Sequence, residues 1–197
     1  MTVISQVPDY SLDDSFLESN DATVLFQSLE TEVEWDKSIK ARMTACYGET
    51  YDESGVDYEI KPMHELLNPL CEAIGKRLKF KPTNCLLNYY NDGKSTMGFH
   101  SDTISNLENR TGIAIVSLGA ERELTFRHIE NLDLKHTYLL PHGSLFYMTQ
   151  DTQRHWKHAV KKAAVDSPRI SPVSYTHLRA HETEADLVCR LLLEKKK

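Results

Sequence analysis

The sequence lacks the features that mark several protein classes. Its longest apolar runs, such as 112–118, are far too short to span a bilayer, and its first ten residues contain neither a basic nor an apolar segment. Its four cysteines form no Cys-x-x-Cys pair and no zinc-ligand spacing, so free thiols in a reducing compartment are expected. We therefore expect a cytosolic or nuclear protein that does not bind membranes.

The sequence also has no excess of positive charge. Its formal net charge of −6 argues against a broadly cationic surface. Any binding of nucleic acid would then need a local basic patch, because phosphate contacts supply most of the non-specific affinity. With 197 residues, of which 40% are hydrophobic and 26% charged, the chain is typical of a single globular domain with a core.

Two helices are expected ahead of a region of short strands. Asn20 or Asp21 can cap a first helix over 22–29. Pro62 suits the first turn of a second helix. The buried face of that helix comprises Leu66, Leu67, Leu70, Ile74 and Leu78. From Cys85 onward, short apolar runs alternate with turn signals, which is typical of a β-sandwich or barrel.

The triplet His100-Ser101-Asp102 is the first candidate for chemistry. On a strand, side chains alternate, so the imidazole and the carboxylate would share one face and could bind one metal ion. His158, in a later short apolar run, is the candidate third ligand, and His155 is its rival. Two histidines and one carboxylate form the facial triad of non-haem Fe(II) oxygenases, which leaves three coordination positions open.

An ordered set of motifs surrounds these residues. The set comprises Asn88-Tyr89-Tyr90, Gly93, His100-Ser101-Asp102, Val116-Ser117-Leu118-Gly119, Arg122, Phe126-Arg127-His128, Gly143-Ser144-Leu145, Gln153, Trp156, His158 and Arg169-Ile170-Ser171. In order and spacing, the set resembles the AlkB-like family of Fe(II)- and 2-oxoglutarate-dependent dioxygenases over about residues 20–171. The resemblance implies an α+β fold, in which a double-stranded β-helix (jelly roll) is supported by N-terminal helices. It also implies Fe(II), 2-oxoglutarate and O2, used by a monomer to remove alkyl groups from nucleobases in DNA or RNA.

Three groups of residues receive a role from the resemblance. The metal ligands and catalytic residues are His100, Asp102 and His158. The contacts to 2-oxoglutarate are Asn88, Tyr90 and Arg169, of which arginine suits a carboxylate because its planar fork binds bidentately. The substrate contacts are Arg42, Tyr51 and Ile104. The alternative for Arg42 is a solvated side chain, and for Asn88 and Tyr90 a buried pair that satisfies backbone groups.

The sequence departs from the family pattern at two places. Many base demethylases carry a carboxylate two residues after the metal-binding aspartate, where this chain has Ile104. This leaves open a protein or small-molecule substrate, or a β-helix that serves as a binding module without catalysis.

The second departure follows Arg169-Ile170-Ser171. The family continues there as Leu-Thr-Phe-Arg, whose arginine is its second cosubstrate contact, but this chain reads Pro172-Val173-Ser174-Tyr175. Pro172 lacks the N–H that a central ladder needs. We therefore expect a dioxygenase domain over 1–171 with a truncated last strand and low activity, followed by a non-native tail over 172–197 that resembles translated cloning sequence. The alternative is a divergent C-terminal helix around 185–193.

Overall fold

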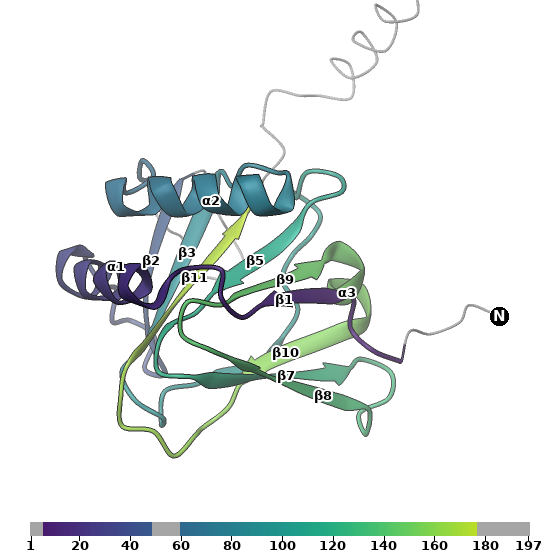
Figure 1. Ribbon diagram of the computed structural model, residues 1–197. Helices are drawn as coiled ribbons and strands as arrows, with labels where there is room; N and C mark the ends of the chain where they lie inside the picture. Colours follow the sequence, from purple (N-terminus) through teal and green to yellow (C-terminus); the bar gives the residue numbers. More distant parts are fainter. Residues whose placement is uncertain (1–5, 49–59, 177–197) are drawn as a thin grey trace, which may run out of the picture.

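A computed structural model describes residues 6–48 and 60–176 of the protein (Figure 1). The strands of its larger sheet are β1 (Tyr10–Asp13), β2 (Met43–Gly48), β3 (Asn84–Tyr90), β5 (Gly112–Val116), β6 (Leu118–Gly119), β9 (Leu145–Thr149) and β11 (Arg169–Tyr175). The strands of its smaller sheet are β4 (Met97–His100), β7 (Arg122–His128), β8 (Lys135–Leu140) and β10 (Trp156–Val160). The helices are α1 (Ser19–Glu32), the 3-10 turn η1 (Glu65–Leu67), α2 (Asn68–Leu78) and α3 (Gln150–His155).

The strand order is that of a double-stranded β-helix. The larger sheet runs β1-β9-β5-β11-β3-β2, with β6 also paired to β11, and the smaller sheet runs β4-β10-β7-β8. All of the pairings between these strands are antiparallel. Helices α1 and α2 cover one face of the larger sheet, and the smaller sheet lies on its other side (Figure 1). The predicted α+β jelly roll with supporting N-terminal helices is confirmed.

The core has two layers, one on each face of the larger sheet. Along β3, Leu87 packs toward the helices with Leu29 and Ile74, while its neighbour Leu86 packs toward the smaller sheet with Phe126. Successive residues of a strand point to opposite faces. Strands β3 and β5 are buried at every position, because both of their faces are covered.

Both predicted helices form, but each begins elsewhere than expected. Helix α1 starts at Ser19, and Glu18 stands at its N-cap without a side-chain capping bond. The second helical segment starts at Glu65 rather than at Pro62, because His64 Nδ1 accepts the N–H of Leu66 and caps the turn. The proline in the first turn of α2 is Pro69.

The last strand continues past Ser171, so the expectation that it ends there is wrong. Strand β11 pairs with β3 in unbroken register from Arg169 to Tyr175. On its other side β11 pairs with β6 at Arg169 and Ile170 and with β5 at Val173 and Ser174. The ladder on that side is interrupted between β6 and β5, next to Pro172. An interrupted ladder tolerates a residue without an N–H.

No helix among the described residues combines the length and the apolar content that crossing a membrane requires.

Candidate metal centre

Three predicted ligands converge where the smaller sheet meets the cavity between the sheets. His100 is the last residue of β4 and His158 is the central residue of β10, and the two are directly paired across these strands. Asp102 lies two residues beyond the end of β4, in a segment without regular structure. The strand-alternation argument for His100 and Asp102 was therefore wrong, although both side chains reach the same point.

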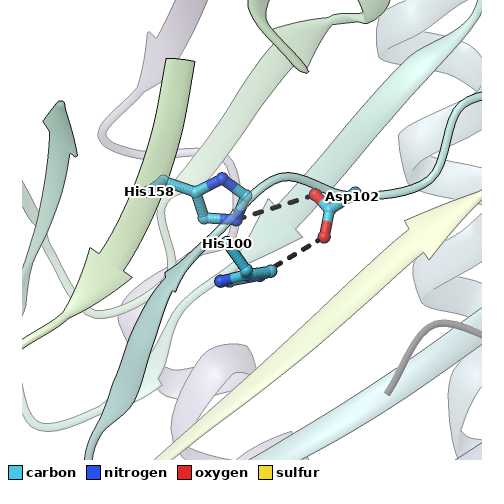
Figure 2. A group of neighbouring side chains, drawn as sticks. All are labelled: His100, Asp102 and His158. Carbon is cyan, nitrogen blue, oxygen red and sulfur yellow. Dashed lines mark ion pairs between the residues drawn. The ribbon is translucent and has the colours of Figure 1, made fainter. Parts of the chain in front are cut away.

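The ligand atoms of these three residues all lie within 4.8 Å of one another. Asp102 lies to one side of the two imidazoles, and its carboxylate faces both (Figure 2). Its Oδ1 is 3.4 Å from His100 Nε2, and its Oδ2 is 3.6 Å from His158 Nε2. The imidazole centroids are 4.2 Å apart. Among the described residues, no other three His, Cys, Asp or Glu side chains gather in this way.

Hydrogen bonding and burial prepare both imidazoles to bind a cation. The Nδ1 of His100 lies 2.9 Å from the carbonyl oxygen of Gly98. Since a carbonyl only accepts, Nδ1 donates, and Nε2, which faces Asp102, is the nitrogen left to bind a metal ion. Burial lowers the pKa of His158 to about 4, against the opposing charge of Asp102. His158 is thus neutral at pH 7, as a metal ligand must be.

The pKa of His100 is shifted in the other direction. Burial disfavours its charged form, but the hydrogen bond and charge of Asp102, with the carbonyl of Gly98, raise the pKa above its ordinary value. His100 is also the more exposed imidazole, with 27% of its side chain accessible against 6% for His158. The cluster therefore has one buried neutral ligand and one that faces solvent.

The rival ligand His155 lies outside this cluster. It ends helix α3, and its Nε2 is 3.7 Å from Asp151 Oδ1. Its ring is stacked on that of His128, with centroids 6.5 Å apart. His155 is helical and is not part of the cluster, so the choice of His158 stands.

The three ligands line a cavity of about 300 Å³ between the two sheets. Its walls are largely apolar, with Leu86, Ile115, Leu124, Val160 and Val173 among the lining residues. A few polar side chains project among these walls, namely those of Arg42, Asn88, Tyr90, Arg169, Ser171 and Tyr175. A small, mostly apolar cavity with few convergent polar groups is typical of a site for a small molecule.

Arg169 supplies a buried cation to this cavity. Its side chain is 1% exposed, and its Nε donates to Ser117 Oγ at 2.9 Å. Its guanidinium carbon lies 5.3 Å from the ring centroid of Tyr90. Burial lowers the pKa of Arg169 to about 10, so the group stays charged at pH 7. Its buried Nη1 has no hydrogen-bond partner among the described residues, which leaves a donor for an anion.

Asn88 and Tyr90 lie beside Arg169 on strand β3, and both are 2% exposed. The Oδ1 of Asn88 accepts a hydrogen bond from Arg42 Nε at 2.6 Å. The hydroxyl of Tyr90 donates to Met97 Sδ at 3.8 Å. The predicted cosubstrate residues and Arg42 are therefore brought to one cavity with the metal ligands.

The sequence matches the profile of the 2OG-Fe(II) oxygenase superfamily over residues 14–184. The chain belongs to this superfamily. Within the superfamily its relatives are AlkB-like. It is 31% identical over 182 residues to the DNA oxidative demethylase ALKBH2 of Mus musculus, covering 77% of this chain and 73% of the relative. The Homo sapiens ALKBH2 is 30% identical over 178 residues, covering 77% of this chain and 67% of the relative.

Other relatives are matched over a smaller share of their length. ALKBH2 of Bos taurus is 31% identical over 179 residues, covering 77% of this chain and 63% of the relative. The alpha-ketoglutarate-dependent dioxygenase alkB homolog 3 of Homo sapiens is 30% identical over 168 residues, covering 75% of this chain and 58% of the relative. The chain thus spans 63% of the Bos taurus ALKBH2 and 58% of this homolog 3.

Solved structures share the fold of this superfamily member. OsALKBH1 superposes with a TM-score of 0.63 at 14% identity, covering 86% of this chain and 99% of that one. A Pseudomonas putida prolyl-4-hydroxylase superposes with a TM-score of 0.56 at 15% identity, covering 88% and 95%. At such low identity these likenesses show the jelly roll only.

The donor set fits the two groups that the superfamily is named for. His100, Asp102 and His158 supply two neutral nitrogens and one carboxylate, the ligand set that leaves positions open on Fe(II). The unpartnered Nη1 of Arg169 fits a carboxylate such as that of 2-oxoglutarate. This superfamily member therefore has residues that fit Fe(II) and 2-oxoglutarate, and the open positions on the metal ion leave room for O2.

One predicted substrate contact, Ile104, is not among the residues that line the cavity. Ile104 lies in the loop after Asp102 and packs, partly buried, against the core between the sheets, outside the residues that line the cavity. Tyr51 falls outside the described residues. Arg122, one of the residues of the motif set, is 2% exposed and donates to the backbone carbonyls of Asp92 and Ser95, so it is not solvated.

The roles of three residues in or next to the cavity were not predicted from the sequence. Val173 and Tyr175 line the cavity although they belong to the segment that was set aside as a tail. They alternate with Arg169 and Ser171 along β11, so period two was the signal that could have found them. Ser117 holds Arg169 across the sheet, and no local pattern in the sequence marks that contact.

Proposed function

We propose that this protein is an Fe(II)- and 2-oxoglutarate-dependent dioxygenase that oxidatively removes N-alkyl groups from nucleobases in DNA or RNA. One observation carries the proposal. The metal cluster of His100, Asp102 and His158 lines the same cavity as Arg169. A site for a metal ion and a site for a carboxylate are thus joined in one small cavity.

The metal ligands and the polar residues of the cavity would bind different groups. His100, Asp102 and His158 would hold the iron, and Arg169 with Asn88 would hold and orient the far end of 2-oxoglutarate. When bound, the iron with 2-oxoglutarate and O2 supplies the oxidant that hydroxylates the N-alkyl carbon, and 2-oxoglutarate leaves as succinate and CO2. The hydroxylated group is a hemiaminal, which breaks down to an aldehyde and the free amine.

The charges of the site support this assignment. Two neutral imidazoles and one carboxylate leave a divalent ion with one residual positive charge. That charge and the guanidinium of Arg169 together match the two negative charges of 2-oxoglutarate. The largely apolar walls lower the local dielectric constant, which strengthens both interactions.

A cationic row on the outer face of the smaller sheet supports a nucleic-acid substrate. Lys157 on β10 pairs directly with Arg127 on β7, and Arg127 pairs directly with Lys135 on β8. Lys157 and Lys135 are exposed. Like charges opposite one another across strands destabilise a sheet. Their alignment in a chain of net charge −6 therefore indicates an anionic partner.

An aromatic ring extends the cationic row toward the metal centre. Phe99, next to His100, lies with its ring centroid 4.2 Å from the guanidinium carbon of Arg127 and 5.8 Å from Nζ of Lys161. Lys157 and His158 are neighbours on β10, one exposed and one buried. A phosphate backbone bound on this face would lie on the opposite side of β10 from His158, and cations with an aromatic ring suit such a backbone.

The names of the relatives agree with this substrate class, since ALKBH2 is a DNA oxidative demethylase. A flipped or single-stranded base would have to enter the cavity, as in other enzymes that act on a base. Action as a monomer in the nucleus or the cytosol is part of the same proposal.

The proposal is tested by incubating the protein with Fe(II), 2-oxoglutarate and a panel of methylated DNA and RNA oligonucleotides. Mass spectrometry should show loss of the methyl group from at least one oligonucleotide, with one succinate formed for each methyl group removed. Free methylated nucleosides and methylated peptides serve as the alternative substrates. Turnover of a peptide or a small molecule alone would replace the nucleic-acid part of the proposal, and metal binding without any turnover would favour a binding module.

A further inference from the structure

Asp102 is the one metal ligand that no strand holds in place. Strand β4 ends at His100, and the segment after it has no regular structure. Two hydrogen bonds attach this segment instead. The N–H of Asp102 donates to Gln153 Oε1 at 2.9 Å, and Ser101 Oγ donates to the carbonyl oxygen of Trp156 at 3.0 Å.

Both acceptors belong to one short stretch of chain that leads into the third ligand. Gln153 is in helix α3, Trp156 begins β10, and His158 follows two residues later. Gln153 is 4% exposed and Trp156 is 1% exposed, so solvent does not compete for these bonds. The position of Asp102 is therefore set relative to the same junction between α3 and β10 that sets the position of His158.

The hydrogen bond also fixes which way the Gln153 amide points. A backbone N–H only donates, so the atom that faces Asp102 must be the amide oxygen. The amide nitrogen is then buried, and it has no hydrogen-bond partner among the described residues. Burying an unpaired amide nitrogen is unfavourable, and an apolar side chain would fill the same space without that cost. The glutamine is therefore explained by the hydrogen bond that its amide oxygen accepts from Asp102.

We infer that Gln153, assisted by Ser101, is the positioning residue that holds Asp102 in its metal-binding place. The inference rests on the proposed metal centre and adds a role that the three ligands do not supply. Hydrogen-bonded partners behind a metal ligand typically contribute about ten- to a hundred-fold to metal affinity. Gln153 accepts from the backbone N–H of Asp102, so it fixes the position of the Asp102 main chain and leaves the charge of the carboxylate unchanged.

The test measures metal binding in the absence of turnover. Apo-protein is titrated with Mn(II) under anaerobic conditions, without 2-oxoglutarate or nucleic acid, and the dissociation constant is determined. Gln153→Met, which keeps the length of the side chain and removes the acceptor, should weaken Mn(II) binding about ten-fold or more. Gln153→Glu keeps an acceptor at the same place and should bind Mn(II) at least as tightly as the unchanged protein.

A matched control comes from the same helix. Gln150 donates through Nε2 to the carbonyl oxygen of Glu108 at 2.8 Å, at an exposed position. Gln150→Met removes a glutamine hydrogen bond from α3 without touching Asp102, so its Mn(II) affinity should match that of the unchanged protein. Ser101→Ala, which removes a single hydroxyl, should weaken Mn(II) binding in the same direction as Gln153→Met. Circular dichroism confirms that each titrated protein is folded.

The outcomes separate this inference from the proposed function. Equal Mn(II) affinity in Gln153→Met, Ser101→Ala and the unchanged protein would overturn the positioning role while leaving the metal centre intact. Failure of the unchanged protein to bind Mn(II), or equal binding by His100→Ala, would overturn the metal centre and the inference together. The positioning role is established if Gln153→Met binds Mn(II) more weakly, while Gln153→Glu and Gln150→Met bind it as tightly as the unchanged protein.

Discussion

Arg42 Nε donates to Asn88 Oδ1 at 2.6 Å, so the predicted substrate contact and a predicted cosubstrate contact are joined by a hydrogen bond. The donor is charged, and such bonds are shorter and stronger than neutral ones. The bond holds the Asn88 amide in one orientation within the cavity. Arg42 therefore contacts a predicted cosubstrate residue, although the family resemblance implies a substrate contact for it.

Replacing Arg42 should consequently impair use of 2-oxoglutarate. In Arg42→Met the amide of Asn88 loses its charged donor, a loss that costs about 1.5–3 kcal/mol, and the KM for 2-oxoglutarate should rise about ten-fold. The measurement is succinate formation at varied 2-oxoglutarate. Lys40→Met removes an exposed cation two residues away and should leave this KM unchanged. An effect of Arg42→Met confined to the KM for the oligonucleotide would contradict the coupling.

The metal ligands give a second prediction with an internal control. His100→Ala, Asp102→Ala and His158→Ala should each abolish 2-oxoglutarate turnover and weaken Mn(II) binding, because the three ligand atoms converge on one point. His155→Ala should retain both properties, because His155 pairs with Asp151 on helix α3 instead. Full turnover by His158→Ala, with loss in His155→Ala, would reverse the assignment of the third ligand.

Most of this site could be predicted from the sequence, because its residues are marked by type and spacing. His100, Asp102, His158 and Arg169 are chemically distinctive, and their order along the chain matches a known pattern. How Asp102 is held could not be predicted in the same way. The expected strand ends at His100, and the bond to Gln153 joins residues that are 51 positions apart.

The errors in the fold have local physical causes. The second helix begins at Glu65 rather than at Pro62 because a histidine, an unusual capping residue, accepts the first free N–H. Ile104 stands where many base demethylases carry a carboxylate, but in this fold it packs against the core between the sheets. Pro172 was read as the end of a ladder because sequence alone does not show that the neighbouring strands are interrupted beside it.

The cationic row leads to a third prediction, on nucleic-acid binding. Lys157→Gln and Arg127→Gln should each raise the KM for a single-stranded methylated oligonucleotide and leave kcat nearly unchanged. Each lost phosphate contact should also reduce the slope of log affinity against log salt by about 0.7. Lys76→Gln, at an exposed position on α2 away from the smaller sheet, is the control. Equal salt slopes in all three variants would remove the cationic row from the substrate path.

A fourth prediction concerns the attachment of α1 to the larger sheet. The hydroxyl of Tyr89 on β3 donates to Glu30 Oε1 on α1 at 2.6 Å, and Tyr89 is 8% exposed. Tyr89→Phe should lower the free energy of unfolding by about 1–2 kcal/mol, since the bond has a charged partner. Glu30→Gln keeps an acceptor and should cost less. Chemical denaturation of the three proteins measures both differences.

The pH dependence of this contact follows from the direction of the Tyr89 pKa shift. Burial, then the hydrogen bond and charge of Glu30, raise the pKa of Tyr89 above its ordinary value. Between pH 6 and 9 the hydroxyl is protonated in both folded and unfolded states, so the difference between Tyr89→Phe and the unchanged protein should stay constant. Above about pH 10 only the unfolded state loses the proton. The stabilising contribution should then diminish, and an increase there would contradict the assignment.

The last prediction concerns Tyr175, which stands where the family pattern has its second cosubstrate arginine. Strand β11 is formed as far as Tyr175, and Arg169, Ser171, Val173 and Tyr175 all line the cavity. A guanidinium at position 175 would thus enter the same space as that of Arg169 without any rebuilding of the strand. Tyr175→Arg should therefore tighten 2-oxoglutarate binding about ten- to a hundred-fold, the contribution of one charge-assisted hydrogen-bonded contact.

The same change should make stability depend on the cosubstrate. Position 175 is 2% exposed, and a buried arginine without a partner is unfavourable, so the melting temperature of Tyr175→Arg should fall in the absence of 2-oxoglutarate. Saturating 2-oxoglutarate should then raise the melting temperature of Tyr175→Arg by more than it raises that of the unchanged protein, because the ligand supplies the missing anion. Tyr175→Phe, which keeps the ring, should show neither effect. Weaker 2-oxoglutarate binding by Tyr175→Arg would mean that the cosubstrate does not reach this end of β11 and that the tyrosine does not stand in for an arginine.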